Sequence, residues 1–135
     1  MREILFRGYQ MFKENDGWVY GYLKIGDIAG TRTAFIIPAD FDKCPIKEAP
    51  VYEHTVSQYT GLKDNNGVKV FEGDIIKSTE TEEVAVVQWF EEHSSFMVYI
   101  PSHHAVDYIG EVESGIIEVV GNIYENPSLL GEESE

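Results

Sequence analysis

The sequence predicts a mainly β protein, a compact, partly open barrel or sandwich of short antiparallel strands with at most one or two short helical turns. About eight short apolar runs, separated by turn residues, are the first observation behind this prediction. The second is an aromatic content of 13%, because aromatic and β-branched side chains suit the pleated surface of a sheet. A chain of 135 residues is about the size of one domain, and we expect residues 1–130 to form it.

The amino-terminal part predicts a β-hairpin followed by a third strand. Residues 4–12 fit a strand with a mixed or bulged face, and residues 18–25 fit its return strand after the turn sequence Glu-Asn-Asp-Gly at 14–17. We expect a loop from Gly26 to Thr31 and a third strand over residues 33–37, which Pro38 ends. Three prolines between residues 38 and 50 predict a long connection, and residues 51–58 alternate weakly, as in a strand.

The central stretch, residues 59–77, contains two turns that follow from residue chemistry. Asp64-Asn65-Asn66-Gly67 joins side chains that tolerate positive φ to a glycine that adopts it freely. Glu72-Gly73-Asp74 is a second bend, after which a buried strand begins at Ile75. With the strands that follow, this stretch is similar to the curled strands of SH3-like small barrels, an analogy that concerns the fold alone.

The carboxy-terminal part predicts three more strands. A turn at residues 78–83 precedes a strand at 84–90, and a turn at 91–94 precedes its return strand at 95–100. Residues 102–114 are ambiguous, and irregular structure with a short helix is our expectation there. A last strand spans residues 116–124, with a bulge or a close backbone approach at Gly121, and one helical turn can follow Asn126 and Pro127. Residues 131–135 form an acidic tail that we expect to be frayed.

The charge is unevenly divided along the chain. Residues 1–77 hold ten basic and eleven acidic residues, whereas residues 78–135 hold thirteen acidic residues and no Lys or Arg, a net charge of −13. Such a surface repels phosphate backbones and disfavours nucleic-acid binding. It is either a solvated, solubilising face or a surface suited to a basic partner.

Cellular location is predicted from features that point to a reducing cytoplasm. The single cysteine, Cys44, cannot form an intramolecular disulfide, and its neighbours do not favour a reactive thiolate. No apolar run approaches the roughly 20 residues that span a bilayer, and the amino terminus is too charged for a signal peptide. We therefore expect a cytoplasmic protein without a membrane association.

Histidines and carboxylates provide the best case for an enzyme. His93, His103 and His104 lie near Glu91, Glu92 and Asp107 in sequence, and these residue types bind zinc and related ions. Their spacing matches no metal motif, and adjacent histidines in a strand point to opposite faces. We therefore predict no metal, cofactor or catalytic residue, and keep a metal-dependent site at the three histidines as the alternative.

A second candidate constellation is the carboxylate pair Asp64 and Asp74, which a hairpin would bring together. The simpler interpretation is that each aspartate accepts hydrogen bonds from backbone N–H groups in its own turn. The aromatic residues of the amino-terminal part also have two interpretations: they form a platform on which nucleic-acid bases stack, or they pack in the core. The lack of a basic groove favours packing in the core.

Three blocks of the sequence stand out: Arg2–Arg7, the central Gln58–Asp64 with Asn66-Gly67 and Phe71–Ile76, and the closing Val119–Pro127 with Leu129-Leu130. In this order they resemble the YopX family, small proteins encoded by phages and prophages of bacteria. Residues 8–57 and 78–115 match no family pattern, and Gly8-Tyr9 departs from the expected small residue and Trp. The resemblance implies a β-rich phage product in the bacterial cytoplasm and supplies no catalytic residue.

The signature positions are interpreted as turn and strand residues that also offer a candidate binding surface. They are Tyr59, Gly61, Asp64, Gly67, Glu72, Gly73, Asp74, Gly121 and Asn122. The functional hypothesis is a non-enzymatic phage accessory protein that binds a host or phage protein through its acidic half, or forms homo-oligomers through sheet edges. The alternatives are a metal-dependent hydrolase or nuclease, and a small nucleic-acid binder that uses Arg2, Arg7, Lys24 and Arg32.

Overall fold

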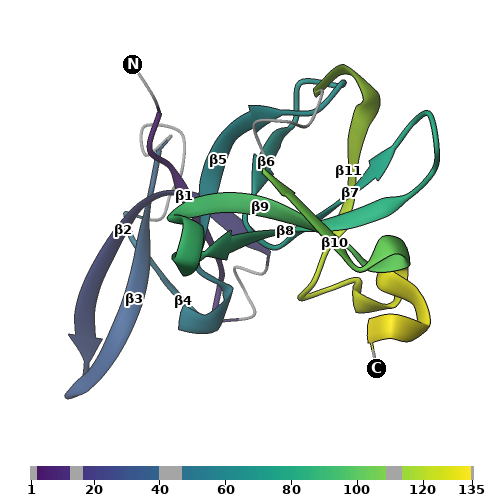
Figure 1. Cartoon of the computed structure of the whole chain (residues 1–135). Helices are drawn as coiled ribbons and strands as arrows, with labels where there is room; N and C mark the ends of the chain where they lie inside the picture. The colour runs from purple at the N-terminus through teal and green to yellow at the C-terminus, as the bar shows by residue number, and fades with distance from the viewer. Residues whose placement is uncertain (1–2, 13–16, 40–46, 109–113, 135) are drawn as a thin grey trace. The chain divides into compact units, whose positions relative to one another are not determined.

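The computed structural model describes residues 3–12, 17–39, 47–108 and 114–134, which contain eleven β-strands and five short 3-10 turns (Figure 1). All strand pairings in this part of the chain are antiparallel, and the predicted mainly β class is confirmed. Each sheet keeps at least one edge strand within these ranges, so neither closes into a complete barrel. Contacts divide the chain into two compact units, residues 1–59 and 60–135.

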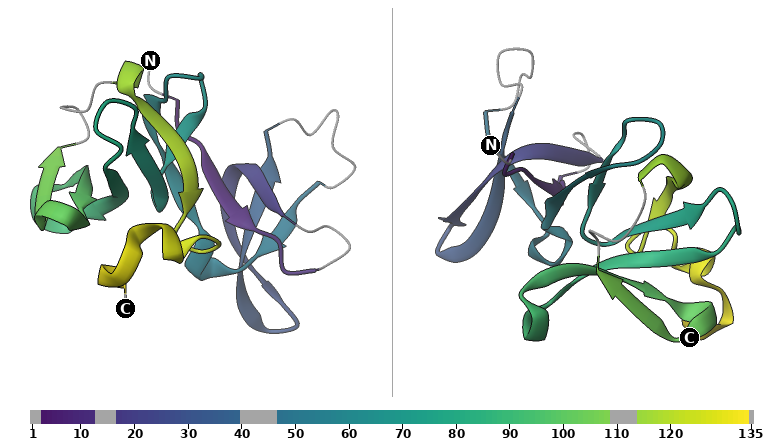
Figure 2. Two further views of the ribbon diagram at one scale, coloured as in Figure 1. Left: turned by 90° about the vertical axis from the view of Figure 1, so that its right-hand side faces the viewer. Right: turned by 45° about the horizontal axis from the view of Figure 1, so that its top comes forward.

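The first unit is a sheet with the strand order β4-β3-β2-β1-β5. Its strands are β1 (Phe6–Tyr9), β2 (Trp18–Ile28), β3 (Thr31–Pro38), β4 (Ala49–Val51) and the start of β5 (Ser57–Lys63), with the 3-10 turn η2 at Glu53–Thr55. β1 pairs with β2 and β5, and β2 and β3 form a long twisted ribbon (Figure 2). The core is aliphatic and consists of Val19, Ala34, Ile36, Ala49 and Val51.

Two predictions in the first unit are wrong. The expected loop at Gly26–Thr31 is mostly strand, because β2 and β3 pair as far as Ile28 opposite Thr31. The turn is only Ala29 and Gly30, both at positive φ (51° and 87°), the requirement of a type I′ hairpin. The expected strand over residues 51–58 is interrupted by η2, where the Thr55 hydroxyl donates to the Tyr52 carbonyl at 2.6 Å. Residues 40–46 of the predicted long connection lie outside the described residues.

The second unit is a five-stranded sheet with the order β10-β9-β8-β7-β11, together with the end of β5 and its neighbour β6. The strands are β6 (Lys69–Phe71), β7 (Asp74–Ser78), β8 (Val84–Phe90), β9 (Ser95–Ile100), β10 (Ala105–Tyr108) and β11 (Ile117–Asn122). Their aliphatic core consists of Val70, Ile76, Ala85, Val87, Val98 and Ile117, with Leu62 of β5 packed against it. β8 and β9 have the predicted bounds.

The predicted turns of the second unit are present, and one ambiguous region is resolved. The turn at Ser78 is closed by a hydrogen bond from its N–H to the Glu83 carbonyl (2.9 Å), and η3 (Glu91–His93) joins β8 to β9. Part of the stretch expected to be irregular is instead η4 (Pro101–His103) and the edge strand β10, and residues 109–113 lie outside the described residues. Residues 105–108 form a strand because they pair with β9, although their own sequence pattern does not indicate a strand.

The last strand is close to the prediction, whereas the helical turn that follows it is longer than expected and runs into the predicted acidic tail. The register of β11 shifts between Val119 and Gly121, which confirms the predicted bulge. The 3-10 turns η6 (Ser114–Ile116) and η7 (Pro127–Ser134) flank the strand, so η7 begins at the proline that suits a first helical position. No helix in the described ranges has the length and apolarity needed to cross a bilayer.

Candidate functional site

Two bends of the second unit, Glu72–Gly73 and the one after β11, are joined through backbone hydrogen bonds. The N–H of Gly73 donates to the Val87 carbonyl (2.7 Å), and its own carbonyl accepts from the N–H of Ile123 (2.9 Å). Gly73 has φ of +88°, and a Cβ there would lie 3.0 Å from a ring carbon of Tyr124. Glycine is therefore required both by the backbone conformation and by the aromatic ring that covers it.

The bend after β11 is organised by the buried side chain of Asn122. Its Oδ1 accepts hydrogen bonds from the N–H groups of Tyr124 (3.0 Å) and Glu125 (2.9 Å), and its Nδ2 donates to Glu125 Oε1 (3.0 Å). The Asn126 side chain returns over the strand and accepts from the Asn122 N–H (3.2 Å). A Cβ at Gly121 would lie 2.6 Å from Asn126 Oδ1, so this position admits no side chain without moving Asn126.

The two bends form one wall of an open groove of about 490 Å³. The end of β8 and the turn η3 form the other wall. Most of the side chains that line the groove are acidic or aromatic, with Val87, Gln88 and Ile123 between them. No Lys, Arg or His is among the described lining residues, and the acidic and aromatic ones are Glu72, Trp89, Phe90, Glu91, Glu92 and Tyr124. We call this surface the acidic-aromatic groove.

Trp89 is the exposed aromatic side chain of the groove, and a neighbouring ring holds it in place. Trp89 is 43% exposed, and its ring packs edge-on against Phe96 with 5.1 Å between the centroids. Glu91 and Glu92 follow directly in η3, and both are exposed. An exposed indole beside carboxylates offers a cation two kinds of attraction, to the face of the ring and to the negative charge.

Asp64 does not face this groove but holds the second unit together. Its Oδ1 accepts hydrogen bonds from the N–H groups of Asn66 (2.8 Å) and Val68 (2.9 Å), and its Oδ2 accepts from the N–H of Val119 in β11 (3.0 Å). Burial by itself raises the pKa of the Asp64 carboxyl, but these three hydrogen bonds outweigh it and hold the pKa below 3.8. The carboxylate therefore fixes both its own turn and the distant strand.

The other signature residues of the central stretch are buried, lie in turns or adopt positive φ, which indicates a structural role. Asp74 is 2% exposed, and its Oδ2 accepts a hydrogen bond from the Phe71 N–H (2.8 Å). Gly61 and Gly67 adopt positive φ, at 92° and 80°. Tyr59 is buried, and burial raises the pKa of its phenol, with the negative charge of Glu3 adding to the effect. Asp64 and Asp74 thus bind different backbone groups.

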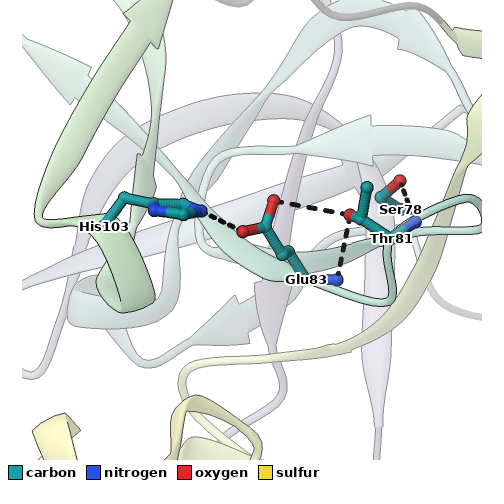
Figure 3. A network of polar contacts seen from close by, with 4 residues as sticks. All are labelled: Ser78, Thr81, Glu83 and His103. Carbon is teal, nitrogen blue, oxygen red and sulfur yellow. Dashed lines mark hydrogen bonds and ion pairs between the residues drawn. The ribbon is translucent and has the colours of Figure 1, made fainter.

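The three candidate histidines have three different partners in the described residues. His93 stacks edge-on against Tyr108 with 5.7 Å between the centroids, and the ring of His104 lies 3.3 Å from the Tyr99 hydroxyl. His103 contacts the carboxylate of Glu83, which also accepts a hydrogen bond from Thr81 (Figure 3). Within the ranges that the structure describes, no group of three His, Cys, Asp or Glu side chains has the arrangement of a metal site.

The sequence indicated half of the groove. Glu72 and Gly73 were selected from the turn pattern, but Trp89 and Tyr124 were not, because their proximity depends on contacts between segments far apart in the chain. One signal was present: an aromatic pair, Trp89-Phe90, directly precedes two glutamates at the predicted end of a strand.

One family of known proteins matches most of the chain. The model of the YopX protein family matches residues 5–131. The chain belongs to the YopX family. None of the curated protein sequences matches the chain.

Two solved structures share the fold. The crystal structure of protein EF1440 from Enterococcus faecalis is 21% identical, with a TM-score of 0.50, and the match covers 96% of this chain and 99% of that one. The crystal structure of protein yopX from Bacillus subtilis is 20% identical, with a TM-score of 0.51, and the match covers 96% and 98%. At this level of identity the likeness concerns the fold alone.

Some of the residues that resemble the YopX family also line the acidic-aromatic groove. Two of the blocks that carry the family resemblance, Phe71–Ile76 and Val119–Pro127, supply Glu72, Gly73 and Tyr124 to the acidic-aromatic groove. The Trp89–Glu92 wall lies outside these blocks but within the matched residues 5–131.

Proposed function

We propose that this YopX protein is a non-enzymatic accessory protein that binds a basic segment of another protein in the acidic-aromatic groove. The observation that carries the proposal is the composition of this groove, in which carboxylates, one exposed indole and two half-buried aromatic rings occur without a basic side chain among the described lining residues. Lysine and arginine are the residues that such a surface attracts, through ion pairs and through stacking on the indole.

The charge of the second unit supports a cationic partner. Residues 60–135 contain sixteen acidic residues and three lysines, a net charge of −13. A field of this sign speeds the encounter with a basic protein and repels nucleic acid, whose phosphates carry the same sign. A protein partner is therefore favoured over DNA or RNA.

The cellular setting of the proposal is a phage or prophage product in the bacterial cytoplasm. The family resemblance supports it, and both solved relatives come from bacteria. We favour binding over catalysis because the candidate acid–base residues are engaged in separate contacts. Asp64 and Asp74 are turn acceptors, and His93, His103 and His104 contact different neighbours.

Fluorescence anisotropy with labelled peptides of equal length tests the proposal directly. A Lys/Arg-rich peptide should bind the full chain, its affinity should fall as salt is raised, and an acidic peptide should not bind. The double substitution Glu91→Gln and Glu92→Gln should weaken binding of the basic peptide about tenfold or more. Trp89→Ser should weaken it with little change in the salt dependence, because it removes the ring and no charge.

Matched control substitutions show whether the basic peptide binds in the groove or is attracted by the negative charge of the whole chain. Glu80→Gln and Glu118→Gln remove the same number of charges from exposed positions that do not line the groove. Equal losses in this control and in the groove variant would refute the assignment. Cross-linking of the intact protein in host extract, with the Trp89→Ser variant for comparison, then identifies the natural partner.

A further inference from the structure

A second cavity, of about 230 Å³, lies in the second unit, is partly open to solvent, and shares no lining residue with the groove. Its walls are aliphatic side chains from β7, β8, β9, η6 and β11: Ile76, Ala85, Val98, Ile100, Ile116 and Ile117. Ile76, Val98 and Ile117 belong to the buried core and are 2–4% exposed, so close packing with their neighbours holds these walls in position.

The polar side chains of this cavity are Ser78, Glu83 and Asp107. Glu83 is oriented by its contact with His103 and by the Thr81 hydroxyl, which donates to Oε1 at 3.4 Å (Figure 3). Asp107 lies on the edge strand β10 and is exposed. No Lys or Arg is among the described lining residues, so the negative charge of the cavity is not neutralised by a basic residue of its own wall.

We propose that this cavity is a binding site for a small organic cation, an alkyl or aryl group that carries a protonated amine. The hydrocarbon part lies against the aliphatic wall and gains the free energy of leaving water. The ammonium group faces the carboxylates, and Asp107 is its main partner because Glu83 already contacts His103. A fatty acid of the same size is disfavoured, since its carboxylate would face two carboxylates.

The size of the cavity defines the class of ligand. Pockets for drug-sized molecules have volumes of roughly 300–1,000 Å³, so a cavity of about 230 Å³ suits a smaller compound. A primary amine on a chain of about six carbons is a suitable probe. Its affinity is limited by its small number of non-hydrogen atoms, because the binding free energy per atom has an upper bound. The basic segment proposed for the groove is a separate ligand, because the two sites have no lining residue in common.

Ligand-observed NMR and calorimetry of the full chain, with hexylammonium, hexanol and hexanoate at neutral pH, test this site. Hexylammonium should bind about tenfold more tightly than hexanol, and hexanoate should bind more weakly than either. Asp107→Asn should reduce the affinity for hexylammonium to that for hexanol, and Ala85→Leu should abolish binding of both by filling the cavity. Glu118→Gln, an exposed carboxylate outside the cavity, should change nothing.

Several results would overturn the proposal. Equal affinity for hexylammonium and hexanol, or no binding of hexylammonium, would show that the carboxylates do not select a cation. An equal effect of Glu118→Gln and Asp107→Asn would reduce the interaction to general surface charge. Asp107 is exposed, so Asp107→Asn keeps the test valid if the buried Ala85→Leu variant fails to fold. Binding of basic peptides to the groove is measured separately with Trp89→Ser and does not depend on this result.

Discussion

Replacing Asp64 should destabilise the protein more than any exposed acidic residue would, because this carboxylate satisfies three backbone N–H groups. Its donors are Asn66 and Val68 in the turn and Val119 in β11, at 2.8, 2.9 and 3.0 Å. In Asp64→Ala, the two exposed turn groups regain water at a cost of about 0.5 kcal/mol each, and the half-buried Val119 N–H costs about 2 kcal/mol. The free energy of unfolding should therefore fall by roughly 3 kcal/mol.

The same carboxylate should make stability depend on pH with a definite sign. Because its pKa in the folded chain lies below the ordinary 3.8, its contribution is fully present above that value and is lost as the pH falls through the folded pKa. Asp64→Asn has no such titration. The gap in unfolding free energy between wild type and Asp64→Asn should therefore be constant from about pH 5 to 8 and should narrow below about pH 4.

Urea denaturation followed by far-UV circular dichroism measures both effects at a series of pH values. Asp27→Asn, at an exposed position of β2, is the matched control and should change the unfolding free energy by less than about 0.5 kcal/mol. If Asp64→Ala costs no more than this control, or if the gap to Asp64→Asn does not narrow in acid, the reasoning about Asp64 is refuted.

The bends of the groove give three further predictions, all measured by urea denaturation. Gly121→Ala should cost about 1–3 kcal/mol, because its Cβ would meet Asn126 Oδ1 at 2.6 Å; a cost near zero would show that Asn126 moves freely. Gly73→Ala should cost more than Gly67→Ala, since both have positive φ but only Gly73 has an aromatic ring within 4 Å of the added Cβ; equal costs would contradict this. Asn122→Ala should cost about 1–3 kcal/mol, because two N–H groups lose their acceptor; a neutral effect would mean that water replaces it.

The sequence predicted those parts of the fold that local chemistry determines. The turns at residues 64–67 and 72–73 depend on asparagine, aspartate and glycine within a few positions, and the strands at 84–90 and 95–100 lie between clear turn signals. The bulge at Gly121 was predicted because an isolated glycine in a strand marks a close approach of other atoms. Here those atoms belong to Asn126.

Contacts along a sheet explain two of the differences between prediction and structure. Residues 26–28 look like a loop because of Gly26, but pairing with β3 extends β2 through them. The turn that follows places Ala29 at positive φ, where alanine is disfavoured, so the residue type gives no signal. β10 is similarly short and exposed, and its hydrogen bonds to β9 determine its conformation. Tertiary pairing overrides weak local preference at these positions.

The candidate groove likewise depends on contacts between distant segments, which the local sequence does not indicate. Glu72, Gly73, Gly121 and Asn122 have a recognisable pattern because they bend the chain, whereas the exposed Trp89 becomes important only when the strand that carries it lies beside those bends. Turn residues and binding residues are thus adjacent but physically distinct.

This distinction separates scaffold from surface by experiment. Gly121 and Asn122 are confined by neighbouring atoms, so their substitution should change stability first, and binding only through loss of the fold. Glu91 and Glu92 are exposed, so their substitution should leave the unfolding free energy nearly unchanged. Trp89→Ser should lower it by about 0.5–1.5 kcal/mol, because the indole packs against Phe96. A loss of peptide binding in a Trp89→Ser protein that is still folded at the assay temperature can therefore be assigned to the groove itself, because the bends that build the groove remain intact.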